Sequence, residues 1–149
     1  HSFPTRRSSD LAIITLEPYD VLDIFEENGF AIVWDDLAQE GRNFRQDVEY
    51  DEDPLMALAK AWNAFDGCSL ATDADKPKGG MLIDALKKYD ADAVIVCMMK
   101  FCDPEEFDYP ILLLQFEEAG VKHIQVEIDQ ESTSFEQLRT RIQTFAEVL

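Results

Sequence analysis

The sequence is poor in basic residues and has no long apolar stretch. Thirteen lysines and arginines stand against 31 aspartates and glutamates, which gives a net charge of −18. Binding to the phosphates of nucleic acid or of an anionic membrane requires clustered Lys and Arg. The longest apolar runs, at 93–99 and 111–114, are much shorter than a membrane span. The composition therefore argues against nucleic acid and membranes as partners.

Cysteine is also scarce, with three residues at Cys68, Cys97 and Cys102. An odd number without a repeated pattern is a poor disulfide framework and suits a reducing compartment. No apolar segment of a signal peptide is visible in residues 1–10. These features predict a cytoplasmic protein.

The first ten residues do not match the rest of the chain. They carry two of the thirteen basic residues and show no apolar periodicity. We therefore predict that 1–10 is a disordered or non-native head and that 11–149 is a single α/β domain. This length suffices for one substantial core. The chain starts without Met, so we expect a truncated chain.

Apolar runs and helical periodicity alternate along the domain. Four strands are predicted, at 11–15, 30–34, 93–99 and 123–128. Helices are predicted from Pro18 to the Asn28-Gly29 pair, at 54–65, at 81–89, from Pro104, at 110–119, and from a Ser134/Gln137 capping box onward. The predicted fold is a three-layer α/β domain with a doubly wound, flavodoxin- or Rossmann-like parallel sheet in the order 2-1-3-4.

The run 93–99 is typical of a central strand that is buried on both faces. After Lys100, the tripeptide Cys102-Asp103-Pro104 predicts the start of a helix, with Asp103 as N-cap and Pro104 as the first helical residue. Cys102 is thus expected at the carboxyl end of the central strand, beside a helix N-terminus. In open α/β sheets, ligands bind at this edge.

A helix N-terminus stabilises a thiolate, so Cys102 is a candidate nucleophile or metal ligand. A nucleophile needs a base, and His123, the one histidine outside the head, is predicted at the opposite edge of the sheet. Cys97 and Cys102 have a C-x4-C spacing, which is a weak iron–sulfur match because Cys97 lies inside a strand. Asp35 and Asp36 follow the second strand, and solvated loop carboxylates are favoured over a metal site there.

One stretch is recognisable: Lys100-Phe-Cys-Asp-Pro-Glu-Glu-Phe-Asp-Tyr-Pro110. It resembles the C-terminal domain of the cluster-binding subunits of the benzoyl-CoA reductase / 2-hydroxyacyl-CoA dehydratase family. The resemblance extends to the segments Asp35-Asp36-Leu, Gly41-Arg42, Glu127-Ile-Asp129, Arg139-Thr-Arg-Ile142 and Phe145-Ala-Glu147. Lys78 stands where relatives are expected to carry Arg. The acidic and aromatic run after Cys102 favours the reductase branch.

The resemblance implies a subunit in which three cysteines from different parts of the chain hold a [4Fe-4S] cluster. It also implies an acyl-CoA thioester substrate, a paired homologous subunit, and an ATP-dependent iron–sulfur activator protein that supplies low-potential electrons. Cys102 matches the last of the three ligands, whereas Cys68 and Cys97 do not fall on ligand positions. The resemblance does not identify the acyl group of the substrate.

Two other functions stay open at this point: a non-catalytic α/β subunit-interaction domain without a cluster, and a thiol enzyme. The aromatic residues Phe101, Phe107 and Tyr109 flank Cys102. They are predicted either to cover a cluster or partner surface, or to belong to the core of the domain. With one thiolate, this chain alone is expected to be inactive and to hold no stable cluster.

Overall fold

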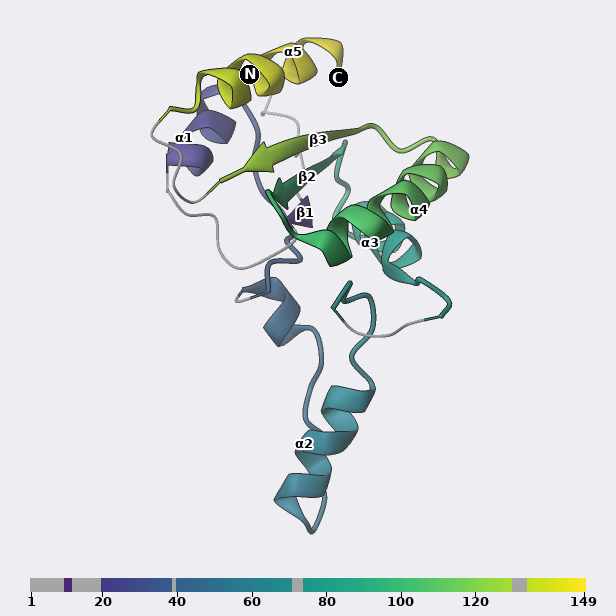
Figure 1. Ribbon diagram of the computed structural model, residues 1–149. Coiled ribbons are helices and arrows are strands. Elements are labelled where there is room, and N and C mark those ends of the chain that lie inside the picture. Colours follow the sequence, from purple (N-terminus) through teal and green to yellow (C-terminus); the bar gives the residue numbers. More distant parts are fainter. Residues whose placement is uncertain (1–9, 12–19, 39, 71–73, 130–133) are drawn as a thin grey trace.

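The computed structural model describes the chain except for residues 1–9, 12–19, 39, 71–73 and 130–133. Its sheet is parallel and has the order β1-β2-β3 (Figure 1). The long strands β2 (Val94–Met99) and β3 (His123–Ile128) pair in register from Val94↔His123 to Met99↔Ile128. The short strand β1 (Asp10–Leu11) pairs with the other side of β2. The predicted first, third and fourth strands are therefore neighbours in the expected order.

The predicted second strand at 30–34 is not a strand in the described part of the structure. In the order 2-1-3-4 its neighbour would be 11–15, and of that segment only Leu11 lies within the described residues. The four-stranded, doubly wound arrangement thus stays a prediction. Phe30 nevertheless belongs to the core, where its ring stacks on that of Phe145 at 6.1 Å.

Strand β2 is buried on both faces, as predicted. On one face, Ile95 and Cys97 join a core cluster with side chains of α1 (Asp20–Glu27) and α5 (Glu136–Val148). On the other face, Val96 and Met98 join a cluster with side chains of α3 (Lys78–Lys88) and α4 (Asp103–Ala119). Each fully buried aliphatic side chain contributes roughly 1.5–3 kcal/mol through removal from water. The sheet therefore lies between two helical layers (Figure 1), and the three-layer architecture is confirmed.

The alternating polar and apolar residues at 123–128 predict a strand less enclosed than 93–99. Strand β3 confirms this, because Glu127 is exposed and His123, Ile124 and Gln125 are only partly buried. None of the helices in the described part of the chain combines the length and apolarity that crossing a membrane requires.

The predicted end of the first helix is confirmed. The amide of Gly29 donates to the carbonyl of Glu26 at 2.9 Å, and the amide of Phe30 donates to that of Phe25 at 2.9 Å. Gly29 has φ = 77°, the left-handed conformation that lets these two bonds close a helix C-terminus. Phe30 is thereby directed back into the core.

The predicted starts of three later helices are wrong by one to three residues. Helix α3 begins at Lys78 instead of 81, and Cys102, not Asp103, is the N-cap of α4. Helix α5 has Phe135 as its N-cap, so Ser134 does not cap it and the capping box is absent. Phe135 packs against the core cluster, and this tertiary contact decides where the chain enters the helix.

Helix α4 continues through Pro110 from Asp103 to Ala119, so the separate helix predicted at 110–119 is wrong. A proline in a helix interior removes one backbone hydrogen bond. The buried side chains Leu112 and Phe116 anchor the second half of the helix against α3 and the sheet, and this packing compensates for the lost bond.

Helix α2 (Pro54–Asn63) begins as the sequence indicates, with the Asp53 carboxylate accepting a hydrogen bond from the amide of Leu55 at 2.9 Å. The helical spacing of Leu55, Leu58 and Trp62 predicts an apolar face packed on a core, but this face is not buried. The side chains of Leu55, Leu58 and Trp62 are 76%, 57% and 78% exposed, because α2 stands apart from the other helices and the sheet (Figure 1). The apolar periodicity thus marks a face without a partner among the described residues.

The division into a head and one domain stays a prediction. Residues 1–9 of the head lie outside the described residues, and Asp10, assigned to the head, is part of β1.

Candidate metal-ligand site

Cys102 lies at the junction between the central strand and a helix, as predicted. Its amide donates to the carbonyl of Met99 at 3.2 Å, and its carbonyl accepts from the amide of Glu106 at 3.0 Å. As the N-cap of α4 it makes no side-chain capping hydrogen bond. The half-buried thiol therefore remains available at the positive end of a 17-residue helix.

The aromatic residues around Cys102 have different environments. Phe101 has φ = 67° and is 89% exposed, and Phe107 is 80% exposed. A left-handed conformation costs a residue other than glycine roughly 1–2 kcal/mol. Tyr109 is partly buried and packs against the cluster between α3, α4 and the sheet. The core interpretation is thus correct for Tyr109 and wrong for Phe101 and Phe107, whose side chains are exposed close to Cys102 in the sequence.

Five ion-paired side chains near the start of α4 form what we call the buried charge cluster: Asp36, Arg42, Lys78 and Glu105, which are buried, and Arg45, which is partly buried. Asp36 accepts from Arg42 at 2.9 Å and pairs with Arg45 at 2.7 Å. Lys78 Nζ lies 3.0 Å from a carboxylate oxygen of Glu105 and 3.8 Å from Asp36. Arg42 also approaches Glu105 to 3.9 Å. Buried ions require such partners, because an isolated buried charge is strongly unfavourable.

Asp36 corrects the sequence-based interpretation of the Asp35-Asp36 pair. Its side chain is fully buried, whereas a solvated loop carboxylate was expected. Asp35 builds the turn that makes this possible, since its carboxylate accepts from the amides of Leu37 at 3.1 Å and Gly41 at 2.8 Å. A Cβ at position 41 would lie 2.5 Å from the Asp35 carbonyl oxygen. Gly41 thus permits the close turn that brings Arg42 onto Asp36.

The buried charge cluster holds three cations and two carboxylates, in a chain with few basic residues. Burial acts to lower the pKa of Arg42, but the charge and hydrogen bond of Asp36 and the charges of Cys68 and Glu105 outweigh burial and raise it. Arg42 donates toward Cys68 Sγ at 3.7 Å. The single excess positive charge of the cluster is offset by Asp103 and Glu106 in the first turn of α4.

Sequence reasoning missed the buried charge cluster. Two sequence features could have indicated this cluster: the Asp36-x5-Arg42 spacing, and the cation Lys78 at the position where an arginine was expected. Lys78 supplies the positive charge there and pairs with Glu105.

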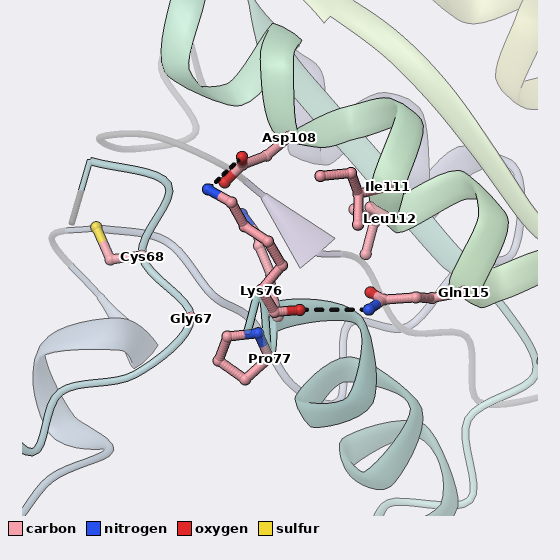
Figure 2. A pocket seen from close by; sticks show the side chains of 9 residues that line it. Gly67, Cys68, Lys76, Pro77, Asp108, Ile111, Leu112 and Gln115 are labelled. Carbon is pink, nitrogen blue, oxygen red and sulfur yellow. Dashed lines mark hydrogen bonds and ion pairs between the residues drawn. The ribbon is translucent and has the colours of Figure 1, made fainter. Parts of the chain in front are cut away.

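Cys68 lies beside a small cavity between the end of the 64–70 segment and α4 (Figure 2). Lys76 crosses this cavity to Asp108 with a Nζ–Oδ1 distance of 2.8 Å, and its carbonyl accepts from Gln115 at 3.3 Å. The cavity measures about 20 Å³, which is enough for about one water molecule. It is therefore too small for an acyl-CoA.

The other candidate residues are not brought to Cys102. His123 lies at the amino end of β3, where its ring is 5.3 Å from that of Phe116 and its Nδ1 is 3.0 Å from the carbonyl of Val121. Cys97 is buried in the core. Within the described ranges, no group of three or more His, Cys, Asp or Glu side chains could hold a metal ion. The described residues therefore do not form a complete metal site.

Comparison with known proteins places the chain in a family. Residues 12–149 match the family model described as 2-hydroxyglutaryl-CoA dehydratase, D-component. The chain is 56% identical over 137 residues to lactoyl-CoA dehydratase subunit beta of Anaerotignum propionicum. It is 42% identical over 136 residues to the (R)-phenyllactyl-CoA dehydratase beta subunit of Clostridium sporogenes. It is 26% identical over 132 residues to a benzoyl-CoA reductase subunit of Thauera aromatica.

These matches cover 91%, 91% and 87% of the chain but only 37%, 36% and 34% of the three relatives. The chain thus spans about a third of the length of the curated relatives it matches. Its identity to the dehydratase subunits exceeds that to the reductase subunit, which does not favour the reductase branch. The family match covers nearly the whole chain, and the resemblance inferred from the Cys102 segment is confirmed: the chain belongs to the 2-hydroxyglutaryl-CoA dehydratase D-component family.

Proposed function

We propose that this chain is part of the beta-type subunit of a 2-hydroxyacyl-CoA dehydratase and that Cys102 provides one thiolate ligand to a [4Fe-4S] cluster. The remaining ligands come from parts of the subunit outside this chain. When bound, the cluster passes low-potential electrons from an ATP-dependent activator protein to an acyl-CoA thioester. The chain acts with a paired homologous subunit and has no activity alone.

The observation that carries this proposal is the 56% identity to a lactoyl-CoA dehydratase beta subunit across 91% of the chain. The position of Cys102 supports it, because the thiol is not used in capping α4 and lies at the end of the helix that stabilises an anion. Three acidic residues in the first turn, Asp103, Glu105 and Glu106, oppose this effect. Lys78 offsets one of them through its ion pair with Glu105.

The roles of this chain's residues follow from this geometry. Cys102 holds the metal centre, and the buried charge cluster fixes the first turn of α4 on which Cys102 is presented. Phe101 and Phe107 are exposed and offer apolar surface to the parts of the enzyme that would cover Cys102. Solvent access and hydrogen bonds to the ligand sulfur are among the factors that set the potential of an iron–sulfur centre.

The test is iron content in the complete subunit, prepared without oxygen together with its paired subunit. Cys102→Ser replaces a thiolate with a harder and much less acidic ligand, so iron per subunit should fall to near zero. Cys68→Ser and Cys97→Ser are matched controls that should keep full iron. Full iron in the Cys102→Ser variant, or loss of iron in a control, would show that the ligand assignment is wrong. A wild-type complex without iron would favour the non-catalytic interaction domain.

A further inference from the structure

The segment 45–66, called the arm here, carries α2 away from the rest of the domain (Figure 1). Its apolar side chains Leu55, Leu58 and Trp62 are each more than half exposed. Ala57 is the one residue of α2 that is buried. Soluble monomers rarely expose contiguous apolar patches of this kind, and such patches mark interaction sites.

The arm is held together by its own contacts. Lys60 Nζ lies 2.6 Å from the Asp51 carboxylate and joins α2 to the preceding segment of the arm. Nearer the domain, Arg45 donates to the carbonyl of Asp66 at 3.1 Å and lies 5.1 Å above the ring of Phe65. Isolated helices as short as α2 are unstable in water. The exposed Lys60–Asp51 pair adds little stability, whereas the contacts of Arg45 fix the base of the arm and reduce the ordering entropy that binding would otherwise require.

The base of the arm is anchored next to Cys102. Arg45 pairs with the buried Asp36, and the neighbouring Arg42 reaches Glu105 in the first turn of α4, shortly after Cys102. The arm is thus attached at the edge of the sheet that presents the proposed cluster ligand, while α2 lies at its far end.

We propose that the exposed apolar face of α2 docks on the paired subunit of the dehydratase. This inference rests on the proposed function, in which further parts of the same chain bring cluster ligands to Cys102. Those parts must cover the edge at the base of the arm. Helix α2 is carried beyond that edge and is placed to reach a separate chain. Three of the relatives are named as beta subunits, which implies such a chain.

The chemistry of the arm also describes the partner surface. Six carboxylates and two cations lie within 45–66, and the apolar face of α2 contains Leu55, Leu58 and Trp62. Trp is enriched in interface cores, and charged residues are found at the rim. The complementary surface is therefore an apolar groove with basic residues at its border.

Hydrogen exchange of the complete beta-type protein, alone and in complex with its alpha partner, tests this inference. Amides of α2 should exchange at least tenfold more slowly in the complex than in the free protein. Slow exchange already in the free protein would mean that its own further domains cover α2. Equal and fast exchange in both samples would mean that nothing covers it. Either result would overturn the proposal.

A pair of variants adds an affinity measurement. The double substitution Leu55→Glu/Trp62→Glu should weaken assembly with the alpha partner at least tenfold, and the unfolding temperature of the free beta-type protein should be unchanged. Val148→Glu, at a 70% exposed apolar residue of α5, is the matched control and should assemble normally. Unimpaired assembly of the double variant would contradict docking.

These readouts do not depend on the cluster. A complex that assembles with α2 protected but lacks iron would refute the proposed function and keep the docking surface. A complex with full iron and exposed α2 would refute the docking surface alone.

Discussion

The Nζ atom of Lys78 lies 3.0 Å from Oε2 of Glu105, and both side chains are more than nine-tenths buried. This ion pair joins the first residue of α3 to the first turn of α4. It also explains why α3 begins earlier than its apolar pattern predicts, since the helix extends to place the lysine beside the carboxylate.

Replacing Lys78 with Met should strongly destabilise the domain. The substitution removes the charge but keeps the length of the side chain, and Glu105 then remains buried with Arg42 at 3.9 Å as its nearest cation. Loss of one partner of a buried pair typically costs about 3–5 kcal/mol. The free energy of unfolding from urea titration measures this effect.

Lys87→Met is the control on the same helix. Lys87 and Asp84 form an exposed pair with a distance of 4.0 Å, and such pairs contribute about 0.5 kcal/mol or less. The double variant Lys78→Met/Glu105→Leu should lose less stability than the sum of its single variants. Equal effects of Lys78→Met and Lys87→Met would contradict the role assigned to the buried pair.

Adjacent glycines in α3 should respond in opposite directions to alanine. A Cβ at Gly79 would lie 1.8 Å from Oε1 and 2.9 Å from Cβ of Gln115 on α4, whereas a Cβ at Gly80 meets nothing within 4 Å. Gly79→Ala should destabilise the domain by about 1–3 kcal/mol through overpacking. Gly80→Ala should stabilise it by about 0.5–1 kcal/mol, because alanine favours the helix. Thermal unfolding of both variants measures these changes in stability. A stabilising Gly79→Ala would show that the α3–α4 contact is looser than described.

Cys97→Ser should reduce stability without affecting iron. Cys97 is 3% exposed and packs in the core, so a hydroxyl there costs about 1–3 kcal/mol if it finds no partner. Thermal stability and iron per subunit should be measured on the same complete enzyme. Loss of iron at unchanged stability would instead support Cys97 and Cys102 as joint ligands in a C-x4-C iron–sulfur site.

The isolated chain should not form a stable cluster. Reconstitution with iron and sulfide under anaerobic conditions should give no stoichiometric cubane absorption, because one thiolate does not replace the several that such clusters need. A stable cubane spectrum from this chain alone would contradict the prediction.

The Asp51 carboxylate should titrate below its ordinary pKa of 3.8. Its hydrogen bond from Lys60, followed by that from the amide of Asp53, lowers the pKa. The stabilisation that this carboxylate gives to the arm is therefore complete above its unfolded pKa of about 4. It is lost as the pH falls through the lower folded pKa. An NMR titration should show the lowered pKa of Asp51 in the wild type and a return toward the ordinary pKa in Lys60→Met. The same Asp51 pKa in both proteins would show that the Lys60–Asp51 ion pair is not formed.

Local sequence signals were sufficient to predict several structural features of this domain and its family. The continuous apolar run at 93–99 predicted a strand buried on both faces, because side chains alternate across a sheet and every position was apolar. The Asn28-Gly29 pair predicted a helix end, because Gly29 adopts a left-handed conformation at low cost. The segment around Cys102 was enough to identify the family.

The exposure of α2 and the burial of Asp36 depend on packing between segments that are far apart in the sequence. The apolar spacing of α2 is that of a buried helix, yet the fold leaves this face exposed, since periodicity records which face is apolar and not what covers it. Asp36 has the sequence context of a surface carboxylate until the fold brings Arg42, Arg45 and Lys78 around it. The charge state and burial of such a group depend on partners far along the chain, and only the tertiary structure determines which partners arrive.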